Sequence, residues 1–136
     1  MLKANVWAAG IVYGTIEDQA RWLITNLNHG EYNGERIIEQ QTFAEITTSH
    51  FRTDDMNFTS NFGGPDTTMG LTWWLKEEGG DKYFAHSGSV PGYTAWIAGN
   101  LDRGFGVAIL TNGHASHPHI SLLAEQALAL LKKQHR

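Results

Sequence analysis

The sequence predicts an α+β fold in which an antiparallel sheet meander of about four strands is flanked by helices. Four strand-like runs follow one another between residues 70 and 111. The connections between them are far shorter than the dozen or more residues that a parallel crossover needs. Helical periodicity lies on both sides of this region. With 41% hydrophobic and 18% charged residues among 136, the composition is typical of one globular domain spanning residues 1–136.

The first helix is predicted over Thr15–Asn28. Thr15 can cap its N-terminus, and Asp18 follows at the spacing of a capping box. Gly30 is well placed for the left-handed conformation that ends many helices. The apolar positions recur at helical spacing along one face: Ile16, Ala20, Leu23, Ile24 and Leu27.

A shorter helix is predicted over Gln41–Thr48, after a connector at residues 31–36 that carries an Asn-Gly turn signal. Its inward positions are Phe43, Ala44 and Ile46. Residues 50–68 show no clear period and are rich in turn formers, which predicts a long surface loop. A loop of this length in a compact domain is usually functional or disordered.

The second half of the chain contains the predicted strands and a final helix. The strands are expected at residues 70–75, 82–87, 93–99 and 104–111, with turns at 78–81 and 100–104. Lys132 and Lys133 lie near the C-terminus of the final helix, where the helix dipole favours positive charge. The apolar positions of that helix are Ile120, Leu123, Ala124, Ala127, Leu128 and Leu131.

Composition excludes several classes of protein. The net charge of −4 supplies no basic patch, so no nucleic-acid partner is expected. No apolar run approaches the roughly 18 residues of a membrane span. The chain has no cysteine, which excludes disulfides and thiolate metal sites. The first ten residues, MLKANVWAAG, do not resemble a signal peptide, and the compartment stays open.

The stretch His86-Ser-Gly-Ser-Val-Pro-Gly-Tyr93 is the main candidate for chemistry. On a strand, His86 and Ser87 point to opposite faces and cannot form a Ser–His pair with each other. Ser89 does not fit a nucleophile elbow, because another strand rather than a helix follows it. The residues alone therefore favour a glycine- and proline-rich turn between strands, with an active site as the alternative.

Other candidate clusters favour structural readings. Three histidines in His114–His119 have metal-like spacing, but no acidic residue lies near them, so solvated loop histidines are favoured and no metal is expected. The aromatic residues Trp73-Trp74 and Trp96 are expected in the core or under a helix rather than as a ligand platform. The acidic pairs Asp54-Asp55 and Glu77-Glu78 are expected to be solvated surface charges.

Four stretches in order resemble the penicillin-recognising serine hydrolases, a superfamily that holds class C type β-lactamases, DD-peptidases and related esterases. The first is similar to the family segment AAGGLYSTAEDLARWL, and the last to its HSG/HGG, PGY and GFGVVVLTN strands. No single motif is highly specific, but their order and spacing match over nearly the whole chain. The matching residues are 8–23, 33–37 with 43–50, 70–75, and 86–93 with 104–112.

The resemblance implies roles for the candidate stretch. His86-Ser87-Gly88 matches the family's third catalytic motif, Lys-Thr-Gly or His-x-Gly. By resemblance, His86 supplies a proton donor and local positive character, Ser87 faces the substrate, and Gly88 lets the acyl group approach the strand closely. The backbone N–H of Ser89 is expected to be an oxyanion-hole donor, which stabilises the charge that develops on the carbonyl oxygen.

The PGY turn beside that motif is expected to bind substrate through Gly92 and Tyr93. The complete protein is expected to act on a small-molecule or peptide acyl substrate, and no cofactor is implied. Whether that substrate is a β-lactam, a stem peptide or a simple ester stays open.

The chain departs from the family where the nucleophile should be. The family's nucleophile is the serine of Ser-x-x-Lys, assisted by a Tyr-x-Asn or Tyr-x-Ser motif. No tyrosine here fits, and no serine is followed by lysine at the third position: Ser49, Ser60, Ser87, Ser89, Ser116 and Ser121 all fail. In family members both motifs precede the Ala-Ala-Gly segment, near which this chain begins. The chain is therefore expected to be the C-terminal portion of such a hydrolase and to be inactive alone.

Two further hypotheses stay open. In the first, the chain is a non-catalytic binding or assembly module. Strands that complete the sheet in the family would be missing, and the uncovered edge would favour a homo-oligomer. In the second, Ser89 works with a distant histidine as a weak esterase.

Overall fold

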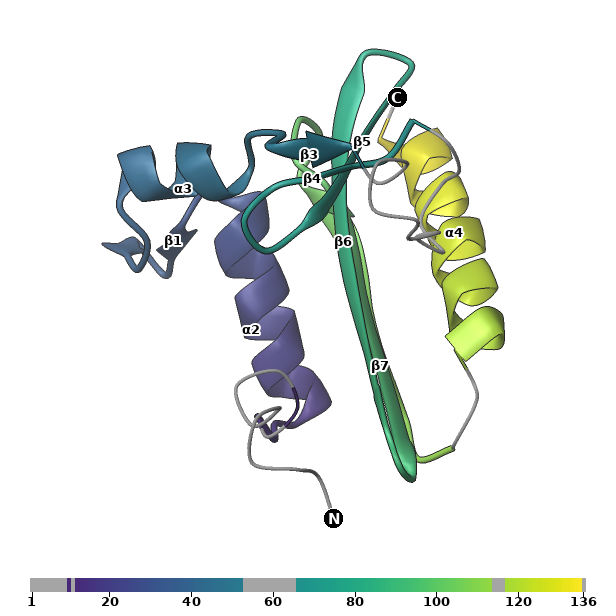
Figure 1. Cartoon of the computed structure of the whole chain (residues 1–136). Coiled ribbons are helices and arrows are strands. Elements are labelled where there is room, and N and C mark those ends of the chain that lie inside the picture. Colours follow the sequence, from purple (N-terminus) through teal and green to yellow (C-terminus); the bar gives the residue numbers. More distant parts are fainter. Residues whose placement is uncertain (1–9, 11, 53–65, 114–116, 136) are drawn as a thin grey trace.

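The computed structural model describes residues 10, 12–52, 66–113 and 117–135. It has three layers, with the main sheet between helix α2 (Ile16–Leu27) on one face and helix α4 (His117–Gln134) on the other (Figure 1). The sheet has six antiparallel strands in the order β3-β4-β5-β6-β7-β8. The predicted α+β class is confirmed, although the sheet has more strands than the four expected.

The strands of the main sheet follow one another in chain order. They are β3 (Phe51–Arg52), β4 (Thr68–Met69), β5 (Trp74–Glu78), β6 (Asp81–Val90), β7 (Tyr93–Asn100) and β8 (Phe105–Thr111). The two extra strands, β3 and β4, lie at the ends of the segment predicted as a loop and pair with each other. Residues 53–65 of that segment, with the acidic pair at 54 and 55, lie outside the described residues.

Helix α2 begins with the predicted capping box. The Thr15 hydroxyl accepts a hydrogen bond from the Asp18 backbone N–H at 3.2 Å, and the Asp18 carboxylate accepts one from the Thr15 backbone N–H at 3.0 Å. Two backbone donors that the first helical turn leaves unpaired are thereby satisfied.

The predicted Asn-Gly turn joins a small hairpin, β1 (Glu31–Tyr32) and β2 (Glu35–Arg36). Asn33 and Gly34 both have positive φ, as a two-residue hairpin turn requires. Helix α3 (Gln40–Ile46) follows and buries Phe43, whereas Ala44 is exposed rather than inward-facing.

The strand predicted at residues 70–75 begins later, at Trp74. Gly70 closes a turn by donating its N–H to the Trp73 carbonyl at 2.8 Å. A side chain at Gly70 would collide with the backbone carbonyl of Ile46 at the end of α3. Glycine therefore serves close packing here and does not lie within a strand.

The strand predicted at residues 82–87 is longer than expected and takes in most of the supposed turn. β6 pairs with β7 from Tyr83↔Asn100 to Val90↔Tyr93, and only Pro91 and Gly92 form the turn. Gly88–Val90, expected in the glycine- and proline-rich turn, therefore belong to the strand, and the turn is limited to Pro91 and Gly92. Continuous pairing in the long hairpin outweighs the low strand propensity of glycine and serine.

The two faces of the sheet carry separate cores. The core under α4 contains Trp74, Tyr83, Ala85, Trp96, Ala98, Phe105, Ile120, Ala124 and Leu128. The core under α2 and α3 contains Leu23, Phe43, Trp73, Leu75, Phe84, Ile97 and Leu101. Trp73, just before β5, and Trp74, its first residue, thus enter opposite cores. Leu123 of α4, predicted to face inward, is 53% exposed.

Candidate functional site

The candidate motif lies where the sheet becomes open on one side. β5 pairs with β6 only as far as Trp74↔Ala85, whereas the pairing of β6 with β7 continues to Val90↔Tyr93. Within the described residues, the half of β6 from His86 to Val90 therefore has a strand neighbour on one side only. Alternate backbone N–H and C=O groups along this edge face away from β7 and can bind an extended chain.

The His86 ring meets tryptophans from both cores at this point. It stacks on the Trp74 indole with centroids 5.3 Å apart and planes 17° apart. It also lies in a T-shaped arrangement with the Trp73 ring, with centroids 6.4 Å apart and planes 76° apart. The residue as a whole is exposed, but these two contacts cover part of its ring.

Partial burial lowers the pKa of His86 below its ordinary value of 6.5, and a hydrogen bond with the Ser87 backbone opposes the shift. A histidine whose pKa lies below 6.5 is mostly uncharged at pH 7. The neutral imidazole that predominates there offers one donor and one acceptor nitrogen.

The remaining motif residues follow along the same strand. Ser87 is half-buried and lies opposite Trp96, while Gly88 and Ser89 are exposed. A side chain built at Gly88 would meet open space. No hydrogen bond of the Ser89 hydroxyl is found among the described residues.

A hollow of about 390 Å³ adjoins the end of this hairpin. Its walls come from the β6–β7 hairpin, from β8 and from the segment that leads into α2. The predicted residues Gly88, Ser89 and Tyr93 line it, whereas His86 and Ser87 do not. Tyr13, which the sequence did not single out, forms part of the opposite wall and is 84% exposed. Gly92 is in the turn beside it, with φ of 90°.

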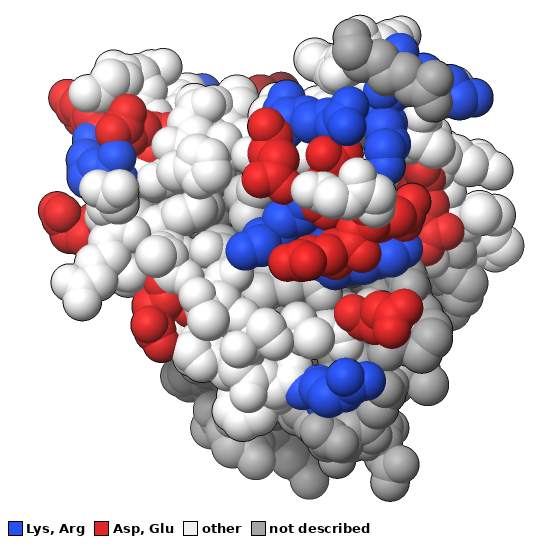
Figure 2. Space-filling view, turned by 90° about the horizontal axis from the view of Figure 1, so that it is seen from above, with Lys and Arg blue, Asp and Glu red and all other residues white. Residues whose placement is uncertain are grey.

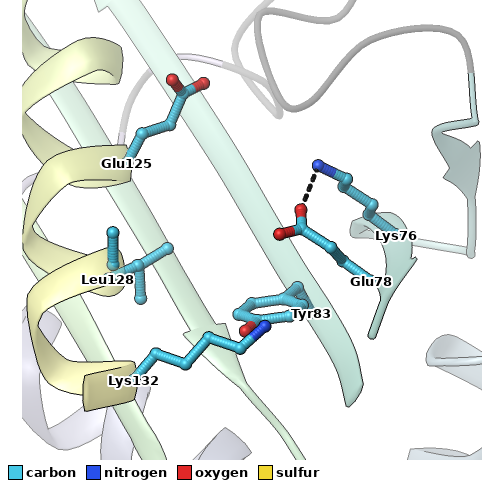
Figure 3. Close-up of a pocket in the computed structure, with 7 residues that line it drawn as sticks. Lys76, Glu78, Tyr83, Glu125, Leu128 and Lys132 are labelled. Atoms are coloured by element: carbon cyan, nitrogen blue, oxygen red, sulfur yellow. Dashed lines mark ion pairs between the residues drawn. The ribbon is translucent and has the colours of Figure 1, made fainter. Parts of the chain in front are cut away.

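A second hollow, of about 280 Å³, lies between α4 and the strands β5 and β6 (Figure 3). Its charged groups are largely engaged with neighbours: Lys76 pairs with Glu78 at 2.6 Å, and Lys132 lies 5.5 Å from the centre of the Tyr83 ring. None of the predicted site residues lines it.

Other kinds of site find no support in the described part of the chain. There, no group of three or more His, Cys, Asp or Glu could hold a metal ion, although His114–Ser116 lie outside the described residues. None of the described helices is both long and apolar enough to cross a membrane. Figure 2 shows basic and acidic side chains interspersed on the face in view rather than a basic patch.

The Trp74–His86 contact could have been found from the sequence by counting register. Gly79-Gly80 form a two-residue turn, so β5 and β6 pair residues whose numbers add to 159, and Trp74 falls opposite Ala85. His86 is the next residue. This count requires knowing that β5 begins at residue 74. The sequence instead suggested a strand that begins at Gly70.

Comparison with known proteins identifies the family. The family model described as Beta-lactamase matches residues 1–131. A solved structure, the octameric penicillin-binding protein homologue from Pyrococcus abyssi, superposes with a TM-score of 0.68 at 27% identity. The match covers 88% of this chain and 24% of that chain, so this chain spans about a quarter of its length. Among curated proteins, none matches the chain.

Proposed function

Because this chain belongs to the Beta-lactamase family, we propose that it forms one wall of an acyl-transfer site, built on the second half of β6. The supporting observation is the edge from His86 to Val90, where the described residues place no strand on the side of the His-x-Gly motif that faces away from β7. The proposed substrate is an acyl compound with an extended backbone, such as a β-lactam, a D-Ala-D-Ala peptide or an ester.

The proposed roles follow from the position of each residue along the strand. The Ser89 backbone N–H donates to the carbonyl oxygen under attack, where such a donor is worth about 2.7–4 kcal/mol in comparable sites. Gly88 leaves the space that a closely approaching acyl group needs, since nothing lies within 4 Å of a side chain built there. Neutral His86 exchanges a proton or hydrogen bond beside the reacting centre.

The attacking group is proposed to come from outside this chain. None of its serines satisfies Ser-x-x-Lys, and an oxyanion-stabilising strand without a nucleophile and a base cannot form an acyl-enzyme. The chain is therefore proposed to correspond to the C-terminal portion of a serine hydrolase and to lack hydrolytic activity alone.

Turnover and covalent labelling test this proposal together. The chain is incubated with a chromogenic β-lactam and with a p-nitrophenyl ester, and its intact mass is measured. We expect hydrolysis no faster than for His86→Ala, and no added acyl mass. An acyl adduct on the wild-type chain that His86→Ala does not form would overturn the assignment of the nucleophile to another segment.

Self-association is the second proposal, and the exposed apolar surface favours it. In the described residues β8 pairs only with β7, and residues 105–111 contain no charge or proline to protect the edge. On α4, Leu122, Leu123 and Leu130 are 53–62% exposed. The structure matched above is an octamer, which agrees with assembly of related chains.

Light scattering over a range of protein concentrations tests this second proposal. We expect a dimer or larger species that Leu123→Glu with Leu130→Glu converts to monomer. Ile37→Glu is the matched control, because Ile37 is equally exposed but lies beyond the β1–β2 hairpin. A wild-type monomer at high concentration would contradict self-association.

A further inference from the structure

The sheet places an aromatic clamp around His86, made of two consecutive residues. Trp73 belongs to the core under α2, and Trp74 to the core under α4. The His86 ring stacks on Trp74 and lies roughly perpendicular to the Trp73 ring, at the point where the pairing of β5 with β6 ends. The His86 ring is therefore in contact with a side chain from the core on each side of the sheet.

Both tryptophans are rigidly held. Trp73 and Trp74 are 4% and 5% exposed, and the Trp74 ring also packs at 6.0 Å from Trp96. Trp73 lies 4.8 Å from the Phe84 ring in an edge-to-face arrangement. A ring that stacks on such a surface has few rotamers available, because the surface itself cannot move aside.

We propose that Trp74 is a positioning residue for His86, holding its imidazole by stacking at the open edge of β6, with the roughly perpendicular Trp73 ring as a second contact. This inference rests on the proposed function for its meaning, since a positioned imidazole matters only if His86 serves the acyl-transfer site. The stacking itself is independent of ligand and of catalysis. Among neighbouring charged groups, Lys76 of β5 pairs with Glu78, and neither is a cause of the His86 shift.

Proton NMR of the ligand-free chain tests the clamp directly. Protons above an indole face are shifted upfield, so the His86 ring signals, assigned by their loss in His86→Gln, should lie upfield of those of a solvated histidine. Trp74→Leu should abolish this displacement, and Trp74→Phe should retain part of it. Trp96→Phe is the matched control, because it alters the same core without removing a ring that contacts His86.

Two results would overturn the proposal: wild-type ring signals at solvated positions, or a displacement that survives in folded Trp74→Leu. If Trp74→Leu does not fold, the phenylalanine pair decides. An upfield displacement that is reduced in Trp74→Phe but not in Trp96→Phe supports the clamp. Equal reductions of the displacement in the two variants refute it. Because no substrate is used, failure of the acyl-transfer proposal cannot imitate either result.

Discussion

The Asp81 carboxylate lies 2.7 Å from Arg103 Nε, which ties the first residue of β6 to the turn between β7 and β8. Asp81 is only 7% exposed, and Lys132 of α4 approaches the same carboxylate at 3.9 Å. Asp81 therefore joins the start of the β6–β7 hairpin to the β7–β8 turn through Arg103, and to helix α4 through Lys132.

Acid should weaken the chain through Asp81. The hydrogen bond from Arg103 is the largest of the causes that hold the Asp81 pKa below its ordinary value of 3.8. A lowered carboxyl pKa contributes stability above the unfolded pKa, and that contribution is lost as pH falls through the folded pKa. Asp81→Asn should lower the melting temperature at pH 7, with a smaller difference from wild type below pH 3.8. Glu35→Gln, at an exposed carboxylate, serves as control.

Removing the helix cap should cost a measurable part of the folding free energy. Thr15→Ala is expected to destabilise the chain by about 1 kcal/mol in urea unfolding, because the Asp18 N–H loses its acceptor. Thr15 and Asp18 form reciprocal hydrogen bonds. The double variant Thr15→Ala with Asp18→Ala should therefore lose less folding free energy than the sum of the two single losses. Additive costs would show that the reciprocal bonds do not act as a unit.

Two glycines of the main sheet, Gly106 in β8 and Gly88 in β6, should respond oppositely to alanine. A side chain at Gly106 would press on the Ala98 carbonyl and on Leu23, so Gly106→Ala should cost about 1–3 kcal/mol. At Gly88 the same change meets open space and should be neutral or stabilising by up to about 1 kcal/mol. Thermal unfolding of the two variants side by side checks this, and equal destabilisation would contradict the packing described for α2 on the sheet.

His86 should make the folded state less stable as the solution becomes mildly acidic. Its pKa is lowered by burial in the folded state, so the unfolded chain binds the proton more tightly. Stability is therefore full above the unfolded value near 6.5 and falls as pH drops through the folded pKa. His86→Gln should flatten the stability profile in this window. A steeper profile in the variant would mean that the sign of the shift is wrong.

Features that depend on local spacing could be predicted from the sequence. The capping box at Thr15 and Asp18 and the Asn33-Gly34 turn are set by neighbours in the chain, and both are present. The antiparallel order of the later strands follows from connections too short for any other arrangement.

Features that depend on distant packing could not be predicted from the sequence. Gly70 suggested a strand residue, yet it packs against the carbonyl of Ile46 from another element. Gly88 and Ser89 suggested a turn, yet pairing with β7 extends the strand through them. Leu123 fits the apolar period of α4 but lies on its exposed side, because the helix meets the sheet through a narrower stripe.

Ligand binding at the open edge of β6 is the most direct test of the acyl-transfer wall. The ¹⁵N-labelled chain is titrated with an N-acetylated D-Ala-D-Ala peptide and with a hydrolysed β-lactam, and amide shifts are followed by NMR. We predict shifts concentrated at residues 86–93, and their loss in Gly88→Val, which fills the open space beside the strand. Unshifted amides at residues 86–93, or shifts that Gly88→Val leaves unchanged, would contradict the central claim.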